Sequence, residues 1–159
     1  MSIRESQRCE AQTLAGERCK LRTARGRMCW IHLKKHKGLR VKRSTIAGLG
    51  LHATKRIPKK KVIAKYTGER LTKAQVDARY KARGQRGDYV LCAGSKPTSQ
   101  CVDARRSNSG VARFANDPRG SGKRANAKLT KAFSLKSKRA IRPGTEILAS
   151  YGAAYWKQN

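Results

Sequence analysis

The sequence predicts a mostly β domain of several small sheets, preceded by a small module that contains cysteine and histidine. Short apolar segments of strand length, separated by glycine and proline, recur between residues 39 and 148, and one segment has the pattern of a helix. Three cysteines and a histidine gather within residues 9–32, where apolar side chains are few. With 159 residues the chain has room for one ordinary domain and a small appendage.

The amino-terminal module, which we assign to residues 1–36, has the spacing C-x9-C-x9-C-x2-H, formed by Cys9, Cys19, Cys29 and His32. Its large apolar side chains within residues 8–32 are Leu14, Leu21, Met28, Trp30 and Ile31. These are too few to fold the segment without a staple, and Zn²⁺ held by three thiolates and one imidazole is the usual solution. Ordinary buried cysteines beside an incidental histidine are the alternative interpretation. His36 and His52 lack partners at ligand spacing and are expected at the surface.

The second region, residues 37–159, contains the expected strands. They cover residues 39–41, 50–53, 62–66, 89–92, 101–104, 132–135 and 145–148. One helix is expected over residues 72–82, where Thr72 can cap the amino terminus. Its apolar face is weak and consists of Ala74, Val76, Ala78 and Tyr80. No internal repeat is visible.

Charge limits the classes of partner. The chain has 39 lysines and arginines against nine acidic residues, a formal charge of +30 that extends from Arg4 to Lys157. Such a surface attracts polyanions. No apolar run is long enough to span a membrane, and the first twenty residues have no apolar core of a signal peptide. We therefore expect an intracellular, reducing compartment, where paired cysteines hold metal more often than they form disulfides.

Four sequence blocks occur in a characteristic order. They are A-G-L-G-L-H-A-T-K-R-I-P from Ala47, Y-T-G-E from Tyr66, V-D-A-R-R-S-N-S-G-V-A-R-F-A-N-D with a later A-N-A-K-L, and I-R-P-G-T-E-I-L-A-S-Y-G-A-A-Y-W from Ile141. With these blocks, the chain from about Gly38 to Trp156 resembles a SET domain, the fold of S-adenosylmethionine-dependent protein-lysine methyltransferases. The resemblance implies several small sheets and a knot-like carboxyl-terminal core.

The resemblance also implies roles for individual residues. The methyl donor would be bound by Gly48, Leu49, Gly50, Arg113, Phe114 and Asn116. Tyr151 would stand beside the transferred methyl group and the target nitrogen, and Tyr66 would line the same channel, with Tyr89 a weaker candidate. An asparagine amide suits a donor site because it offers both a hydrogen-bond donor and an acceptor; the alternative is that Asn116 and Asn126 cap turns. Glu146 is expected to be structural and to pair with backbone or an arginine.

The chain departs from the family after Asn116. The histidine and cysteine that commonly follow are missing, because Asn116 is followed by Asp117, Pro118 and Arg119, and no cysteine follows Cys101. The cysteine cluster that often closes the lysine channel is therefore not expected. Tyr155 and Trp156 are the aromatic side chains available to close it.

The expected substrate is a histone or another basic chromatin protein, which a chain of charge +30 should repel as a free peptide. We therefore expect the basic surface to contact DNA, so that the tail is modified on a nucleosome. The corresponding location is the nucleus or another compartment that contains chromatin, the host nucleus for a viral or pathogen protein. The alternatives are a catalytically inactive, SET-like protein that binds chromatin or DNA, and a small basic RNA- or ribosome-associated protein. The second alternative lacks an evident aromatic stacking platform.

Overall fold

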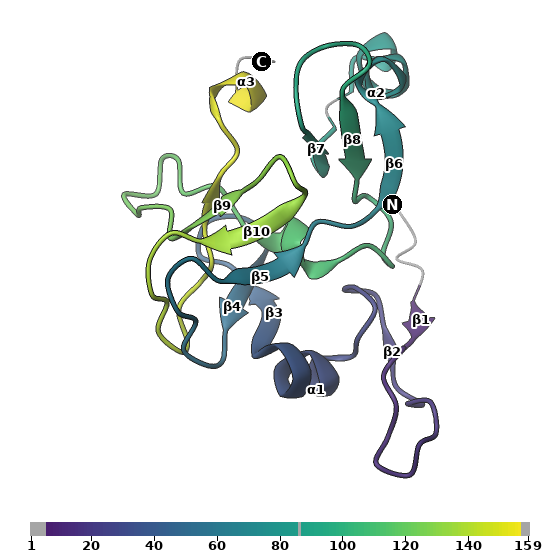
Figure 1. The fold of residues 1–159 in the computed structure, drawn as a ribbon, viewed down its shortest axis with the longest axis vertical. Helices are drawn as coiled ribbons and strands as arrows, with labels where there is room; N and C mark the ends of the chain where they lie inside the picture. Colours follow the sequence, from purple (N-terminus) through teal and green to yellow (C-terminus); the bar gives the residue numbers. More distant parts are fainter. Residues whose placement is uncertain (1–5, 86, 157–159) are drawn as a thin grey trace.

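Four small β-sheets provide most of the regular secondary structure in the described chain, which comprises residues 6–85 and 87–156 of a computed structural model (Figure 1). The sheets pair β1 (Gln7–Arg8) with β2 (Arg22–Thr23), and β3 (Leu39–Arg43) with β4 (Leu49–Ala53). A three-stranded sheet has the order β6 (Glu69–Thr72), β8 (Gln100–Asp103), β7 (Val90–Cys92). A four-stranded sheet has the order β11 (Ala149–Ser150), β9 (Ala127–Leu129), β10 (Ser134–Ser137), β5 (Val62–Lys65). The predicted fold class is confirmed.

The amino-terminal module packs against the body of the molecule. It contains β1, β2 and α1 (Trp30–His32), which continues as a π-helical turn, η1 (Leu33–Lys37), and ends at Gly38 with a φ of 65°. Leu33 belongs to the main hydrophobic core, and Met28 contacts both this core and the cysteine cluster. The Gly26 amide donates to the carbonyl of Ser107 at 3.0 Å. The module is thus attached to the loop that follows β8.

The predicted helix is present as α2 (Lys73–Tyr80), followed by a 3₁₀ turn, η2 (Lys81–Arg83). Thr72 caps it as expected, in a reciprocal arrangement with Gln75. Val76 and Tyr80 form the buried face, because residues four apart lie one above the other on a helix. The expected alanines, at positions 74 and 78, are exposed instead.

A disulfide joins Cys92 on β7 to Cys101 on β8, against the expectation that paired cysteines in this chain hold metal more often than they form disulfides. The two residues face each other in the antiparallel register, with their Cα atoms 4.0 Å apart. Chain position alone could not reveal this register. Beside this sheet, a Cβ on Gly68 would collide with the carbonyl of Asp103, which explains the glycine of the Y-T-G-E block.

The chain before β11 is hydrogen-bonded by two segments, one carrying Asn126 and the other Asn116. The amide of Leu148 donates to Oδ1 of Asn126 at 2.9 Å, and Nδ2 of Asn126 donates to the carbonyl of Glu146 at 2.8 Å. On the other side, the amide of Ala149 donates to the carbonyl of Asn116 at 3.0 Å. The side chain of Asn126 is buried, and it makes the hydrogen bonds that a neighbouring strand would otherwise make with the backbone of Glu146 and Leu148. These hydrogen bonds hold residues 146–149 between the two segments, in the region where the resemblance implies a knot-like core.

Several local expectations differ from the structure. The short strands β1, β2, β6 and β9 were not predicted, and residues 145–148 form isolated bridges, with a regular strand only at β11. His36 is exposed as expected, whereas the prediction for His52 was wrong because this residue is buried on β4. The side chain of Trp156 lies outside the described residues. None of the helices in the described part of the chain has the length and hydrophobicity of a membrane-spanning segment.

Candidate active site and metal centre

One cleft brings together segments that are distant in the sequence. Its volume is about 1690 Å³, larger than the roughly 300–1,000 Å³ of common small-molecule pockets. The walls come from the turn between β3 and β4, the loop after β8, the 3₁₀ turn η3 (Val111–Phe114) and the segment after β11. Six of the predicted site residues line it: Gly48, Leu49, Arg113, Phe114, Asn116 and Tyr151.

Asn116 fixes the turn that precedes β4. Its Nδ2 atom donates to the carbonyls of Ala47 at 3.1 Å and Leu49 at 3.0 Å, and lies 3.2 Å from Oε1 of Glu146. The side chain therefore lines the cleft while its amide nitrogen holds the Gly-x-Gly segment. Gly48 has a φ of 47°, a conformation that favours glycine, and a Cβ there would meet open space.

Glu146 and His52 support the same segment from inside the molecule. A Cβ on Gly50 would collide with the carboxylate of Glu146, so a larger residue here would displace that carboxylate from its position beside Asn116. Glu146 is buried, as expected for a structural residue, and its carboxylate accepts a hydrogen bond from the side-chain amide of Asn116 rather than from an arginine. Nδ1 of His52 donates to the carbonyl of Gly50 at 3.2 Å, and Nε2 lies 4.0 Å from Glu146. Burial lowers the pKa of His52 and favours the neutral ring.

Arg113 stabilises the wall of the cleft. Its Nη1 atom donates to the carbonyls of Ala104 at 2.9 Å and Arg105 at 3.0 Å. The guanidinium carbon lies 4.6 Å from the centre of the Phe114 ring and 5.1 Å from that of Tyr89. These contacts place a cation between two aromatic faces. Tyr89, the weaker candidate in the sequence, consequently forms part of the wall.

The hydroxyl group of Tyr151 has a defined orientation. It donates to the carbonyl of Ala115 at 2.9 Å, and the backbone amide of Tyr151 donates to Oδ2 of Asp117 at 2.7 Å. Because a hydroxyl has one donor and two acceptor positions, the oxygen keeps acceptor capacity after this bond. Burial raises the pKa of Tyr151, so the phenol stays neutral at physiological pH.

Tyr66 is placed differently from its prediction. It is buried in the main core and is not among the described residues that line the cleft. Its hydroxyl donates to the carbonyl of Tyr89 at 2.9 Å. Burial raises the pKa of Tyr66, and the neighbouring Tyr151 adds to the effect. Tyr66 therefore lies in the core behind the cleft wall and stabilises the position of Tyr89 through this hydrogen bond.

Sequence reasoning missed the charged rim of the cleft. Arg79 binds both carboxylate oxygens of Glu69, at 2.8 and 2.9 Å, and reaches Asp103 at 3.1 Å. The hydroxyl of Tyr155 donates to Asp88 at 3.4 Å, and its ring meets that of Tyr151 edge-on at 4.9 Å. The position of Asp117 next to Asn116 could have indicated that an acidic residue borders the cleft. The Arg79 network depends on the register of the sheet, and no sequence pattern indicated it.

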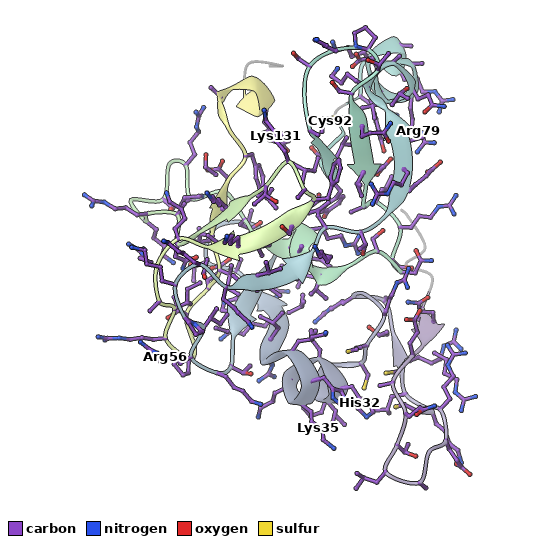
Figure 2. All side chains as sticks on the ribbon, viewed as in Figure 1. His32, Lys35, Arg56, Arg79, Cys92 and Lys131 are labelled. Carbon is purple, nitrogen blue, oxygen red and sulfur yellow. A yellow bond between two sulfur atoms is a disulfide. The ribbon has the colours of Figure 1, made fainter. Side chains whose placement is uncertain are left out.

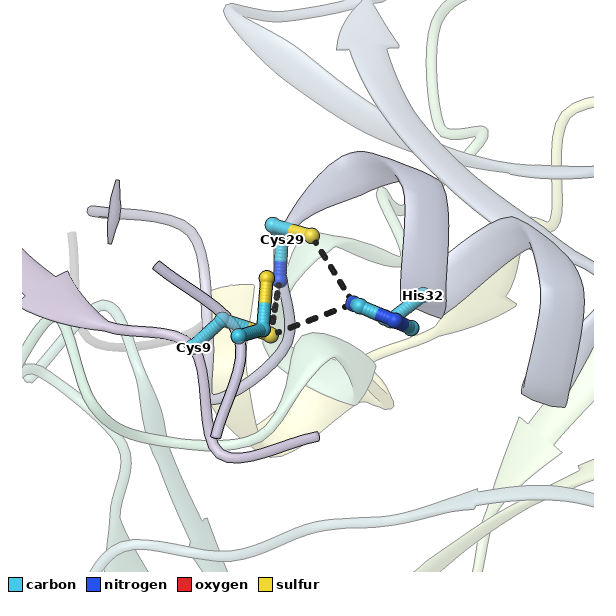
Figure 3. Close-up of side chains that lie close together, drawn as sticks. Cys9, Cys29 and His32 are labelled. Carbon is cyan, nitrogen blue, oxygen red and sulfur yellow. Dashed lines mark hydrogen bonds between the residues drawn. The ribbon is translucent and has the colours of Figure 1, made fainter. Parts of the chain in front are cut away.

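The four predicted metal ligands come together. The ligand atoms of Cys9, Cys19, Cys29 and His32 all lie within 4.8 Å of one another. Nδ1 of His32 is 3.6 Å from Sγ of Cys9 and 3.3 Å from Sγ of Cys29 (Figure 3). Ordinary Zn–S and Zn–N lengths in a tetrahedron place sulfur and nitrogen about 3.5 Å apart. The donor set and its spacing therefore fit Zn²⁺.

Neighbouring backbone groups favour the thiolate form of Cys9, which is the form that binds a metal ion. Its Sγ accepts a hydrogen bond from the amide of Cys29 at 3.2 Å. Burial raises the pKa of the Cys9 thiol, but backbone hydrogen bonds outweigh this effect and lower the pKa. The ring of His32 stacks on that of His36 with centroids 5.6 Å apart, which restrains its orientation.

Comparison with protein families gives one result for this chain. A model described as the SET domain matches residues 48–152, about two thirds of the 159 residues. The six cleft-lining residues fall inside the match, and the cysteine and histidine ligands of the amino-terminal module fall outside it. A comparison with curated proteins gives no match.

Proposed function

Because the chain belongs to the SET-domain family, we propose that it transfers a methyl group from S-adenosylmethionine to a lysine side chain of a protein. The observation that carries this proposal is the convergence of Gly48, Asn116 and Tyr151 on one cleft. These residues come from three separate sequence blocks. Their convergence supports a site in which a donor and an amine meet.

The cleft has features that fit the donor. Gly48 and Leu49 present backbone at its wall, and the turn that carries them is fastened by Asn116. The rings of Phe114 and Tyr89 offer apolar surface. S-Adenosylmethionine supplies an electrophilic methyl group on a sulfonium ion. A cleft of about 1690 Å³ leaves room for both this molecule and an extended lysine side chain.

Tyr151 would orient the amine. Since its hydroxyl hydrogen is directed to Ala115, its oxygen can accept a hydrogen bond from an amine N–H. This contact would hold the nitrogen lone pair in line for displacement, a contribution of geometry that needs no nucleophilic side chain on the enzyme. The neutral phenol is important here, because a phenolate would favour the protonated, unreactive amine.

We further propose that the substrate is a histone lysine on a nucleosome, and that the protein acts in the nucleus or another chromatin-containing compartment. A formal charge of +30 disfavours binding of a free basic tail. DNA phosphates beside the tail would supply the attraction. Neutralising several phosphates makes affinity fall steeply with salt, by orders of magnitude over a modest change in concentration.

Radiolabelled transfer from S-adenosylmethionine tests the proposal. Free histones and nucleosomes are compared over a salt series, and the modified residue is located by mass spectrometry. We expect faster transfer to nucleosomes and a strong loss of rate with salt. Equal, salt-insensitive rates would contradict the proposed role of DNA but would still support the methyltransferase activity. Donor binding without transfer to any protein would support the alternative, an inactive chromatin-binding protein.

A further inference from the structure

A second hollow lies where the amino-terminal module meets β3. Its volume is about 650 Å³, within the usual range for ligand sites. The residues that line it are Arg25, Trp30, Arg40, Val41, Lys42, Arg43, Gly48 and Leu49. Four of these carry positive charge and none is acidic, whereas the larger cleft has seven arginines together with Glu69, Asp88, Asp103 and Asp117 in its walls. No carboxylate in the described lining of the hollow competes with an anion for its cations.

Trp30 makes this hollow different from the general basic surface. Its side chain is 63% exposed, although tryptophan is a large residue that normally buries its ring. The flanking residues Cys29 and His32 belong to the metal cluster, so the backbone beneath Trp30 is held by the metal ligands. An indole held in this way and open to solvent is a stacking platform, the feature that was not evident from the sequence.

Arg25 connects the module to the sheet. Its Nη1 atom donates to the carbonyl of Val41 at 3.4 Å, on the edge of β3 that has no partner strand among the described residues. Arg40 and Lys42 are exposed on the same strand. Their cationic groups and the Trp30 ring thus border one concave surface.

We propose that this hollow binds single-stranded nucleic acid, with backbone phosphates at Arg25, Arg40 and Lys42 and one unpaired base stacked on Trp30. Cationic grooves with an aromatic platform are the general solution for binding single strands without sequence preference. A duplex keeps its bases stacked on one another, so it can use the cations but not the indole. This binding does not require methyl transfer and is measured without it.

The first test compares ligands. Fluorescence anisotropy of the zinc-loaded protein is measured with a labelled single-stranded DNA, a single-stranded RNA and a duplex of the same sequence. Trp30→Ala should weaken binding of single strands on the order of tenfold, as expected for one lost stacking contact. Trp30→Phe should retain most of the affinity, and binding of the duplex should change less than twofold. No loss of single-strand affinity in Trp30→Ala would overturn the proposal.

The second test uses pairs of variants matched in charge. Arg40→Gln with Lys42→Gln removes two cations from the hollow, and Arg56→Gln with Lys59→Gln removes two exposed cations elsewhere. Figure 2 places Arg56 well away from His32 and the module. The hollow pair should reduce the slope of log affinity against log salt by about 1.4 for single strands. An equal reduction in the control pair would show that binding is a property of the whole surface, against the proposal.

Competition with a donor analogue tests whether the hollow and the methyl-donor cleft are separate sites, because Arg25, Gly48 and Leu49 line both. S-Adenosylhomocysteine is added to the preformed complex with the oligonucleotide. We expect the anisotropy to persist. Displacement of the oligonucleotide at concentrations that saturate the cleft would assign the hollow to the donor site and overturn the proposal.

Discussion

At the scale of single residues, Tyr151 is the side chain on which the proposed chemistry depends most. Tyr151→Phe removes the hydroxyl that donates to Ala115 and retains the ring that packs on Tyr155. We expect the turnover number to fall on the order of 10²-fold, comparable to the loss of one preorganised polar group. Affinity for S-adenosylhomocysteine, measured by calorimetry, should stay within about threefold. A parallel loss of donor affinity would instead indicate a damaged cleft.

The pH profile provides a second measurement on the same residue. Since burial raises the pKa of Tyr151, the phenol remains neutral through the alkaline range where a substrate lysine, with a pKa of about 10.4, loses its proton. The rate of transfer should therefore rise with pH up to about pH 10 without a fall caused by Tyr151. A bell-shaped profile that becomes a simple rise in Tyr151→Phe would contradict this assignment.

Asn126 illustrates a residue whose role the sequence could not separate from binding. Its amide forms two hydrogen bonds to the backbone on either side of Ile147, and it is buried. Asn126→Ala leaves the amide of Leu148 and the carbonyl of Glu146 without these partners, at a cost of about 2–4 kcal/mol. Urea unfolding measures the loss. Asn108→Ala, at an exposed position, is the control and should change the free energy of unfolding by less than about 0.5 kcal/mol.

His52 connects stability with pH. Burial lowers its folded pKa, while the unfolded value is near 6.5, so only the unfolded chain takes up a proton just below pH 6.5. Stability is therefore lost as pH falls from about 6.5 towards the folded pKa. We expect His52→Asn to flatten the free energy of unfolding between pH 7.5 and 5. The variant retains all four candidate metal ligands, so any acid release of a bound metal would affect both proteins equally. An unchanged pH dependence would show that the pKa of His52 is the same in the folded and unfolded states.

At the scale of elements, the sequence predicts what depends on local pattern. Thr72 and Gln75 form their cap next to each other in the chain, and α2 was predicted almost to its bounds. The register of β7 and β8 depends on distant pairing. Nothing near Cys92 or Cys101 indicated that they face each other. Likewise β9 consists of three residues and exists because it lies between β10 and β11.

The amino-terminal module, whose Cys3His cluster fits Zn²⁺, is the element with the clearest test. His32→Ala removes one ligand, and His36→Ala removes the exposed ring that stacks on it without removing a ligand. We expect His32→Ala to reduce bound zinc from about one per chain to a small fraction, and to expose residues 8–27 to proteolysis. His36→Ala should keep both properties near those of the original protein. Equal zinc content in the two variants would exclude His32 as a ligand.

At the scale of the whole molecule, the sequence predicted the fold class and the convergence of the blocks, because each block has a fixed place in its family's fold. It did not predict which groups each site residue engages. Asn116 and Arg113 bind main-chain carbonyls of their own molecule, and Tyr66 lies below the cleft wall. Those contacts arise where the segments cross. Their partners are as much as 69 residues away in the sequence, a separation over which no spacing rule operates.

The excess of positive charge should limit the stability of the entire molecule. With a formal charge of +30, like charges lie close together in the folded state and further apart after unfolding. Salt shortens the Debye length from about 30 Å at 0.01 M to about 10 Å at 0.1 M, so it screens this repulsion. We therefore expect the melting temperature to rise when sodium chloride increases over this range. Calorimetry in sodium sulfate of equal ionic strength distinguishes screening, which gives equal gains, from specific anion binding, which gives a larger gain in sulfate. A melting temperature that falls with salt would mean that ion pairs such as Arg79–Glu69 outweigh the repulsion.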